Sequence, residues 1–229
     1  MSASIVSQLV RKDFRLVRGV VLSFVLVSVL FIGILSVMQG HVPFVLMANL
    51  GFIMVMGPAA TCGIVVLMKT NVMEKEKSTQ AFIMSLPVTV KEFTRAKLTL
   101  NLSVFTVFWL AIMAVAYYFA FGRGLLPLGA LPFVTMIFMG GFLAYTLILS
   151  VSLLSQALGL TVLCIVLFEV GTSASMWTIA YFPPIGAHIW DAAPVWNVEA
   201  VTVVAVQAAL AVTAIATTML VQNTRRDFI

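Results

Sequence analysis

Charged side chains are scarce in this chain. Only 9% of its 229 residues are charged, 62% are hydrophobic, and the mean hydropathy is +1.14. Soluble domains carry roughly 25% charged residues, because their surface must meet water. A chain with so little charge cannot cover itself in this way, so lipid must solvate much of its exterior. The composition therefore excludes an ordinary soluble domain and predicts an integral membrane protein.

Residues that build catalytic or metal sites are also few. The two cysteines, Cys62 and Cys164, stand alone inside apolar runs, and neither they nor the two histidines have the spacing of a metal or redox site. The histidines, His41 and His188, fall in separate predicted loops. The chain has no Gly-rich phosphate loop followed by Lys, no nucleophile elbow and no His-Glu-x-x-His motif. We therefore expect no catalytic residue, no metal site and no cofactor on this chain.

Long apolar runs are abundant. Six of them reach the length of about 20 residues that a membrane-crossing helix needs. The first follows a charged stretch and is long enough to span, so we expect it to be retained rather than cleaved as a signal peptide. The expected fold class is all-α, a single transmembrane domain over residues 1–229. The predicted spans are residues 19–38, 44–68, 98–121, 128–154, 157–178 and 199–222.

Basic residues are distributed unevenly between the predicted loops. Of the 13 Lys and Arg residues, 12 fall on one side of a six-span layout and only Arg123 falls on the other. Basic loops stay on the cytoplasmic side of a membrane, so both termini are expected in the cytoplasm. Because this rule accounts for the net charge of +5, the charge gives no reason to expect a nucleic-acid partner.

Residues 1–18 are predicted to form an amphipathic helix that lies on the inner leaflet ahead of the first span. Its apolar residues recur at helical spacing, at Val6, Val10, Phe14 and Val17. Its basic residues fall roughly opposite, at Arg11, Lys12, Arg15 and Arg18. Such a pattern suits the surface of an anionic bilayer. The alternative interpretation is a basic flank to the first span with no structure of its own.

The longest predicted cytoplasmic segment, residues 69–97, carries dense mixed charge. A stretch with few helix breakers comes first, and Pro87 ends it, because proline lacks an N–H and disfavours helix at the residue before it. Thr89 can then cap a second helix, with Glu92 three residues later completing a capping box. The segment thus predicts a short helix, a corner, and another helix that runs into the third span.

Two other connections are also informative. Residues 152–157 carry no charge and must turn tightly between the fourth and fifth spans. Residues 179–198 contain three prolines, which rule out a continuous span there, and aromatic residues that suit a membrane interface. We expect a short re-entrant or interfacial element on the outside, before the last span.

Glu169 lies near the middle of the fifth predicted span. A charged carboxylate at that depth costs about 2.5–3.5 kcal/mol on insertion scales, so it should face protein or water. One interpretation is a substrate-contacting or gating group in a central cavity. The other is a packing residue supported by Thr172 and Ser173, and the sequence leaves both open.

The 69–97 segment also carries a resemblance to a known family. The run from Glu74 to Lys97 has a mixed-charge start, Ser-Leu-Pro-Val at residues 85–88 and a Thr-x-x-Glu turn. It resembles a signature of permease subunits of the type-2 ATP-binding-cassette (ABC) exporters. The opening Val-Arg-Lys-Asp-Phe-Arg-Leu at residues 10–16 is similar to the opening segment of that family. The six-span layout and the element before the last span match as well.

This resemblance implies a mechanism and a set of partners. A coupling helix near residues 74–86 would dock on a separate ATPase subunit, which would hold the ATP and Mg²⁺, and the N-terminal helix would be the connecting helix. Two permeases, identical or homologous, would pair around a path for an amphipathic substrate such as a peptide, a lipid or a drug-like molecule, with Glu169 as a candidate path residue. The analogy places the chain in the plasma (inner) membrane among its lipids. The implied ATPase contacts are Glu74, Lys75, Glu76, Lys77, Phe82 and Met84.

Other classes of function stay open. A secondary transporter or channel would use Glu169 as an ion or proton site, but it would also predict further intramembrane charges or matched Gly/Pro-interrupted helices, which the sequence does not show. A membrane enzyme is disfavoured by the lack of a clustered nucleophile, base or metal ligand. A purely structural or assembly subunit is compatible with the sequence.

Overall fold

The computed structural model describes residues 2–76 and 88–224. These residues form helices and connecting turns, with no strand among them. Two helices end in a wider π turn, and a short 3₁₀ turn precedes another. The elements in chain order are α1 Ser2–Met38, α2 Phe44–Leu67, η1 Met68–Val72 (π), α3 Met73–Glu76, α5 Val90–Tyr117, η2 Tyr118–Gly122 (π), η3 Leu128–Ala130 (3₁₀), α6 Leu131–Ser155, α7 Leu158–Tyr181, α8 Pro183–Gly186 and α9 Val198–Thr224.

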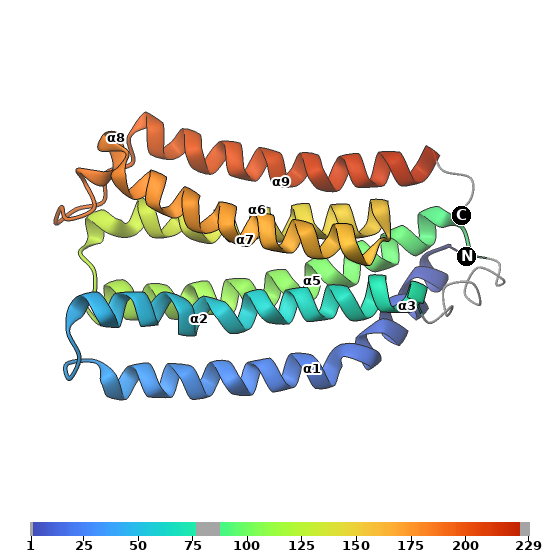
Figure 1. Cartoon of the computed structure of the whole chain (residues 1–229), viewed down its shortest axis with the longest axis horizontal. Coiled ribbons are helices and arrows are strands. Elements are labelled where there is room, and N and C mark those ends of the chain that lie inside the picture. The colour runs from blue at the N-terminus through green and yellow to red at the C-terminus, as the bar shows by residue number, and fades with distance from the viewer. Residues whose placement is uncertain (1, 77–87, 225–229) are drawn as a thin grey trace.

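Six long helices run side by side along the molecule (Figure 1). Helix α1 packs against α2 and α5, whereas α6 packs against α7 and α9, and α2 and α5 also contact α6. Each of the six is long and apolar enough to cross a membrane, alone or with the short turn that extends it. The prediction of an all-helical protein with six helices long and apolar enough to span a membrane is therefore confirmed for the described residues.

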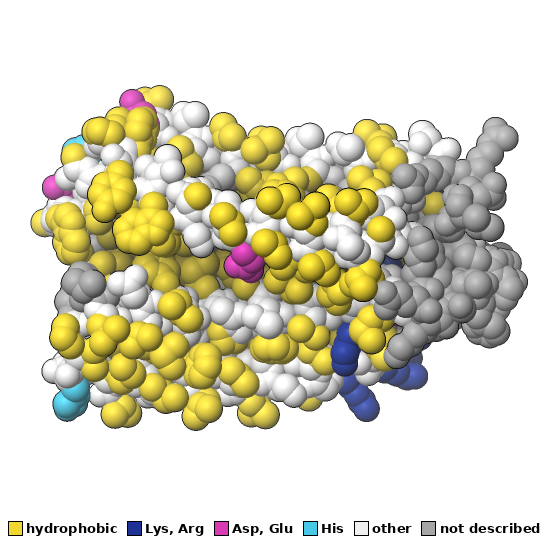
Figure 2. All heavy atoms as spheres, viewed as in Figure 1, with side chains coloured by type: hydrophobic (Ala, Val, Ile, Leu, Met, Phe, Trp, Pro, Cys, Tyr) yellow, Lys and Arg dark blue, Asp and Glu magenta, His cyan; other side chains and the backbone are white. Residues whose placement is uncertain are grey.

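Helix α1 begins and α9 ends at the same end of the bundle (Figure 1), as an even number of crossings requires. Figure 2 shows Lys and Arg side chains gathered at that end of the visible face. We call it the basic end, because it carries residues such as Arg11 and Arg95. Which end faces the cytoplasm stays a prediction from the positive-inside rule.

The N-terminal segment and the first span form one continuous helix, α1, whose N-terminal part lies at an angle to the rest (Figure 1). Residues 2–18 are therefore helical, as predicted, and continuous with the first span, whereas their position on the inner leaflet stays a prediction. Within this part of α1, Asp13 and Val17 are 1% and 0% exposed, whereas Phe14 is 47% exposed. An acidic side chain is thus buried against the other helices, which the sequence analysis did not predict.

Two local predictions from sequence are confirmed. Thr89 caps α5: its hydroxyl accepts a hydrogen bond from the N–H of Glu92, while the Glu92 carboxylate accepts one from the N–H of Thr89 at 3.0 Å. Between α6 and α7 the chain reverses through Gln156 and Ala157 alone, with Gln156 in the left-handed conformation at φ 48°. Local patterns therefore set both helix boundaries.

An aromatic cluster joins α5 to α6 in the centre of the bundle. The Phe105 ring stacks on Tyr145 with centroids 3.6 Å apart and on Trp109 with centroids 5.1 Å apart. The Trp109 indole N–H donates to the carbonyl of Phe138 at 3.0 Å. Helix α2 reaches this cluster through Gly63, where an added Cβ would lie 2.5 Å from a Phe105 ring atom and 2.9 Å from a Tyr145 ring atom. The absence of a side chain at Gly63 is what allows this close contact.

Replacing Gly63 by Ala is expected to destabilise the protein by about 1–3 kcal/mol, because the new methyl group must displace rings that are already stacked. The matched control is Gly57→Ala in the same helix, where an added Cβ meets nothing within 4 Å. That variant should be neutral or slightly stabilising, since Ala favours helix over Gly. Thermal unfolding in one detergent compares the two variants, and equal stability would contradict the described packing.

At the end opposite the basic end, the short helix α8 and the turns after it cover the tips of α6 and α9. The N–H of Gly129 donates to the carbonyl of Asp191 at 2.9 Å, and Ile185 packs with Met136 and Ala200. The Asn197 side chain caps α9 by accepting from the N–H of Ala200 at 2.9 Å. The expected element at residues 179–198 is therefore a short helix with an ordered loop, and its depth in a bilayer stays a prediction.

Candidate functional site

A buried cluster of charges lies at the basic end of the bundle. The Lys97 ammonium donates to the Asp13 carboxylate at 2.7 Å and to the Glu74 carboxylate at 2.5 Å. These side chains are only 2%, 1% and 7% exposed. They come from α5, α1 and α3 respectively. One buried cation therefore connects three separate elements of the chain.

Lys12 completes the cluster from its rim. Its ammonium donates to the second Glu74 oxygen at 2.8 Å and lies 3.1 Å from the second Asp13 oxygen. Its side chain is 43% exposed, so water reaches it. The four residues Lys12, Asp13, Glu74 and Lys97, which we call the ion network, carry two positive and two negative charges. The network is therefore neutral as a whole.

Uncharged polar side chains extend the ion network into the bundle. Asn101, one turn after Lys97, donates to the Lys97 carbonyl at 2.9 Å and to the Thr70 hydroxyl at 3.1 Å. Asn71 donates to the Ser152 hydroxyl at 3.0 Å, which adds α6 to the connected elements. Thr70 and Asn71 are adjacent in the π turn η1 and both are buried. The contacts of Asn101 with Thr70 and of Asn71 with Ser152 hold the stretch just before α3.

The ion network stabilises the fold most when all four of its charges are present. Removing charges from water costs several kcal/mol per ion, and this cost is recovered only where each charge has close partners. Here each carboxylate of the network faces both ammonium groups within 3.1 Å. Loss of one buried partner would leave an uncompensated charge, whereas loss of the half-exposed Lys12 leaves Lys97 in place. The arrangement therefore fixes the relative positions of α1, α3 and α5.

The residues of the predicted coupling segment differ in how far the structure describes them. Glu74 is the one whose side chain is described, and it is bound inside the ion network. Lys75 and Glu76 follow it in α3, but their side chains lie outside the described atoms. The other predicted contacts, Lys77, Phe82 and Met84, lie outside the described residues. Glu74 thus anchors the segment, and partner contacts from its neighbours stay a prediction.

The predicted basic face of the N-terminal helix is largely present. Arg11, Arg15 and Arg18 are exposed along α1, as expected for residues that meet lipid head groups or water. Lys12 is exposed in part, but its ammonium turns toward Glu74. Sequence reasoning missed the inward role of Lys12, and it did not identify Asp13 or Lys97 as partners. The available signal was Asp13 itself, an acid four residues before the buried Val17 on the face that also holds Val6 and Val10.

Glu169 lies on the wall of a groove of about 470 Å³ between α2 and α7, floored by residues of α5 and α6. Its side chain is exposed, and no Lys or Arg of the described residues lies within ion-pairing distance of it. Thr172 and Ser173 line the same groove, as does Asn49 from α2. Figure 2 shows acidic atoms about midway along the visible face, surrounded there by hydrophobic and other uncharged atoms. The structure thus brings Glu169 together with polar groups but leaves it unburied by its own chain.

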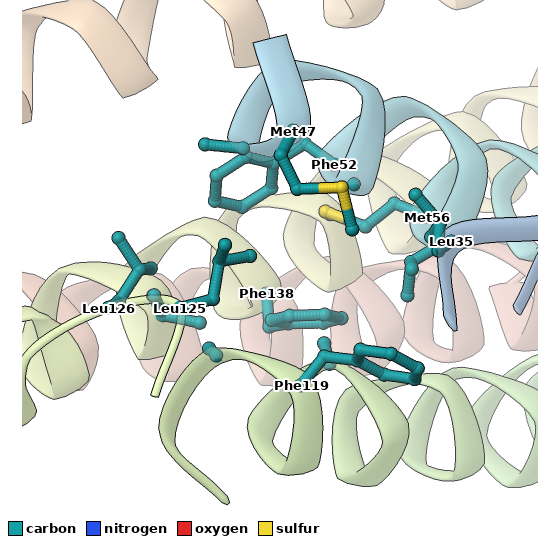
Figure 3. Close-up of a pocket in the computed structure, with 14 residues that line it drawn as sticks. Leu35, Met47, Phe52, Met56, Phe119, Leu125, Leu126 and Phe138 are labelled. Carbon is teal, nitrogen blue, oxygen red and sulfur yellow. The ribbon is translucent and has the colours of Figure 1, made fainter. Parts of the chain in front are cut away.

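A second hollow, lined by apolar residues alone, lies toward the end of the bundle opposite the basic end. Phe52 and Met56 of α2, Phe119 of η2 and Phe138 of α6 converge on it (Figure 3). Its volume is about 50 Å³. One water molecule occupies about 30 Å³ in the liquid. The hollow is too small for a substrate, and its lining offers no polar side chain for a reaction. We therefore regard it as a packing defect between helix ends.

Within the described ranges, no group of three or more His, Cys, Asp or Glu side chains is arranged to hold a metal ion. His188 pairs with Asp191 at 2.8 Å, and His41 contacts the carbonyl of Val37 one turn earlier. Comparisons with protein-family models, with curated proteins and with solved structures found no match for this chain. Its function must therefore be argued from its own residues and contacts.

Proposed function

We propose that this chain is the membrane-spanning permease subunit of an ABC exporter, which works with separate ATPase subunits and a second permease, identical or homologous. The observation that carries the proposal is the ion network. It fastens Glu74, at the start of the segment that resembles the family's coupling region, to Lys97 of one spanning helix and Asp13 of another. A segment that only set topology by its charge would need no such attachment.

A coupling segment must transmit force, and that demands a rigid connection. When nucleotide binding changes the distance between two ATPases, the permease moves with them only if the docked segment cannot slide on its own helices. Buried charges held by several short contacts resist sliding, because any displacement separates opposite charges in a medium of low polarity. The polar contacts through Thr70, Asn71 and Ser152 extend the same attachment to α6.

The groove that holds Glu169 supports a path at the interface of two permeases. A carboxylate exposed at mid-span is costly in lipid, and a facing permease would enclose it together with water or substrate. Polar groups at Asn49, Thr172 and Ser173 beside apolar walls suit an amphipathic substrate such as a peptide, a lipid or a drug-like molecule. ATP and Mg²⁺ would bind on the partner ATPase.

Reversing the charges of Lys75, Glu76 and Lys77 together is the test of ATPase docking. Glu74 is left unchanged, because its carboxylate is bound inside the protein and its loss would disturb the fold. We expect the triple variant to fold normally and to retain a co-expressed ATPase at least about tenfold less well in pull-down, since buried charge pairs at interfaces are worth several kcal/mol. The control is Glu199→Lys, in the first turn of α9 at the opposite end.

Two results would overturn the proposal. One is equal retention of the ATPase by the triple variant and the control. The other is transport by the chain alone in liposomes, driven by an ion gradient and abolished by Glu169→Gln. That second result would identify a secondary transporter that uses Glu169 as its ion or proton site.

A further inference from the structure

A groove runs between α1 and α5 along the side of the bundle, and its two halves differ in chemistry. The half at the basic end has a volume of about 740 Å³ and is lined by Arg11 of α1 and Arg95 of α5. The other half, about 450 Å³, is lined almost wholly by apolar side chains such as Val25 and Val107. Both halves share Phe14 and other residues, so they form one continuous groove. We call it the α1–α5 groove.

The polar half carries a net positive charge. Within the part of the chain that the structure describes, neither Arg11 nor Arg95 has a carboxylate within ion-pairing distance. Glu92 is the one acid that lines the groove, and its Oε2 already accepts from the N–H and the hydroxyl of Thr89. The neighbouring ion network is neutral. Two guanidinium groups therefore face the cavity from α1 and α5, with the single carboxylate of Glu92 beside them.

We propose that the α1–α5 groove binds one anionic phospholipid of the leaflet at the basic end. The phosphate lies between Arg11 and Arg95, because the planar guanidinium group matches phosphate oxygens in geometry and charge. One acyl chain follows the groove past Phe14 toward Val25 and Val107. A soluble anion would satisfy only the polar half, whereas a phospholipid fills both halves in their observed order.

The bound lipid would contact both helices that the ion network joins. Arg11 lies just before Lys12 and Asp13, and Arg95 lies two residues before Lys97. A phosphate between the two guanidinium groups would bring the same parts of α1 and α5 together from the lipid side. This role depends on neither the ATPase nor the transported substrate, so its test is independent of the proposed function.

The polar half is tested by Arg11→Gln with Arg95→Gln in the full chain. Native mass spectrometry in detergent, with added phosphatidylglycerol and then phosphatidylcholine, measures the affinity for each lipid. We expect binding of phosphatidylglycerol to weaken by about tenfold or more, since each basic residue near an anionic lipid contributes substantially to binding. The matched control, Arg15→Gln with Arg123→Gln, removes two charges outside the groove and should change binding less than about twofold.

The apolar half is tested by filling it. Val107→Trp and Val25→Trp, made separately, enlarge side chains that are 71% and 38% exposed, so either is tolerated without disturbing the core. Each is expected to weaken binding of phosphatidylglycerol, and inorganic phosphate at millimolar concentration should not compete with the lipid. Equal binding in the double Arg variant and its control would overturn the proposal. Competition by phosphate, with no effect of either Trp variant, would overturn it in favour of a free anion.

Discussion

Replacing Lys97 by Met is expected to lower the free energy of unfolding by about 3–5 kcal/mol, the usual result of removing one partner from a buried ion pair. The substitution keeps most of the side-chain volume, so lost packing contributes little. It leaves Asp13 and Glu74 buried with only the half-exposed Lys12 between them. Unfolding by added sodium dodecyl sulfate in mixed micelles, followed by circular dichroism, measures the difference.

Two further variants show whether uncompensated charge is the cause. Lys12→Met removes the exposed member of the ion network and should cost only about 1 kcal/mol, because water screens that ammonium. Adding Asp13→Asn and Glu74→Gln to Lys97→Met removes both unbalanced charges and should restore part of the lost stability. If Lys12→Met and Lys97→Met were equally destabilising, the burial of Lys97 would not be what holds these helices together.

Replacing Glu169 by Leu is expected to have opposite effects on folding and on transport. Leucine is favourable at mid-span, whereas a carboxylate costs about 2.5–3.5 kcal/mol on insertion scales, so the yield of folded protein in membranes should rise. If the groove between α2 and α7 is the translocation path, transport by the complete complex should fall by at least about tenfold, because such residues are kept at this cost for their function.

The measurements for Glu169→Leu are membrane yield and substrate transport in the same vesicles. The matched control is Val170→Leu, a neighbouring exposed residue that does not line the groove. It should leave both quantities unchanged. A rise in yield with full transport would remove Glu169 from the path and leave it a tolerated packing residue.

Local sequence rules were sufficient for the six apolar spans, for the start of α5 and for the turn between α6 and α7. The six spans follow from runs of apolar residues longer than the hydrocarbon thickness. The start of α5 follows from Thr89 and Glu92, whose side chains and backbone satisfy each other without any distant partner. The turn at Gln156 follows from the short uncharged connection. In each case the residues that decide the structure are neighbours in the chain.

The ion network could not be predicted in the same way, because its members are far apart in sequence. The pairs Lys97–Asp13 and Lys97–Glu74 are separated by 84 and 23 residues. Topology alone places all these charges at one end of the bundle, where each is equally compatible with a side chain that faces water. Only the packing of α1 beside α5 brings Asp13 opposite Lys97. The α1–α5 groove depends on the same packing, so the position of Arg11 across the groove from Arg95 could not be predicted from the sequence either.

The π turn η1 and the contacts around it limit where residues can be inserted in homologous sequences. Helical residues rotate by about 100° each, so one residue inserted between the membrane part of α2 and Glu74 would swing that carboxylate away from Lys97. The same change would separate Thr70 from Asn101. Homologous chains that keep the ion network should therefore align through Met68–Val72 without an insertion.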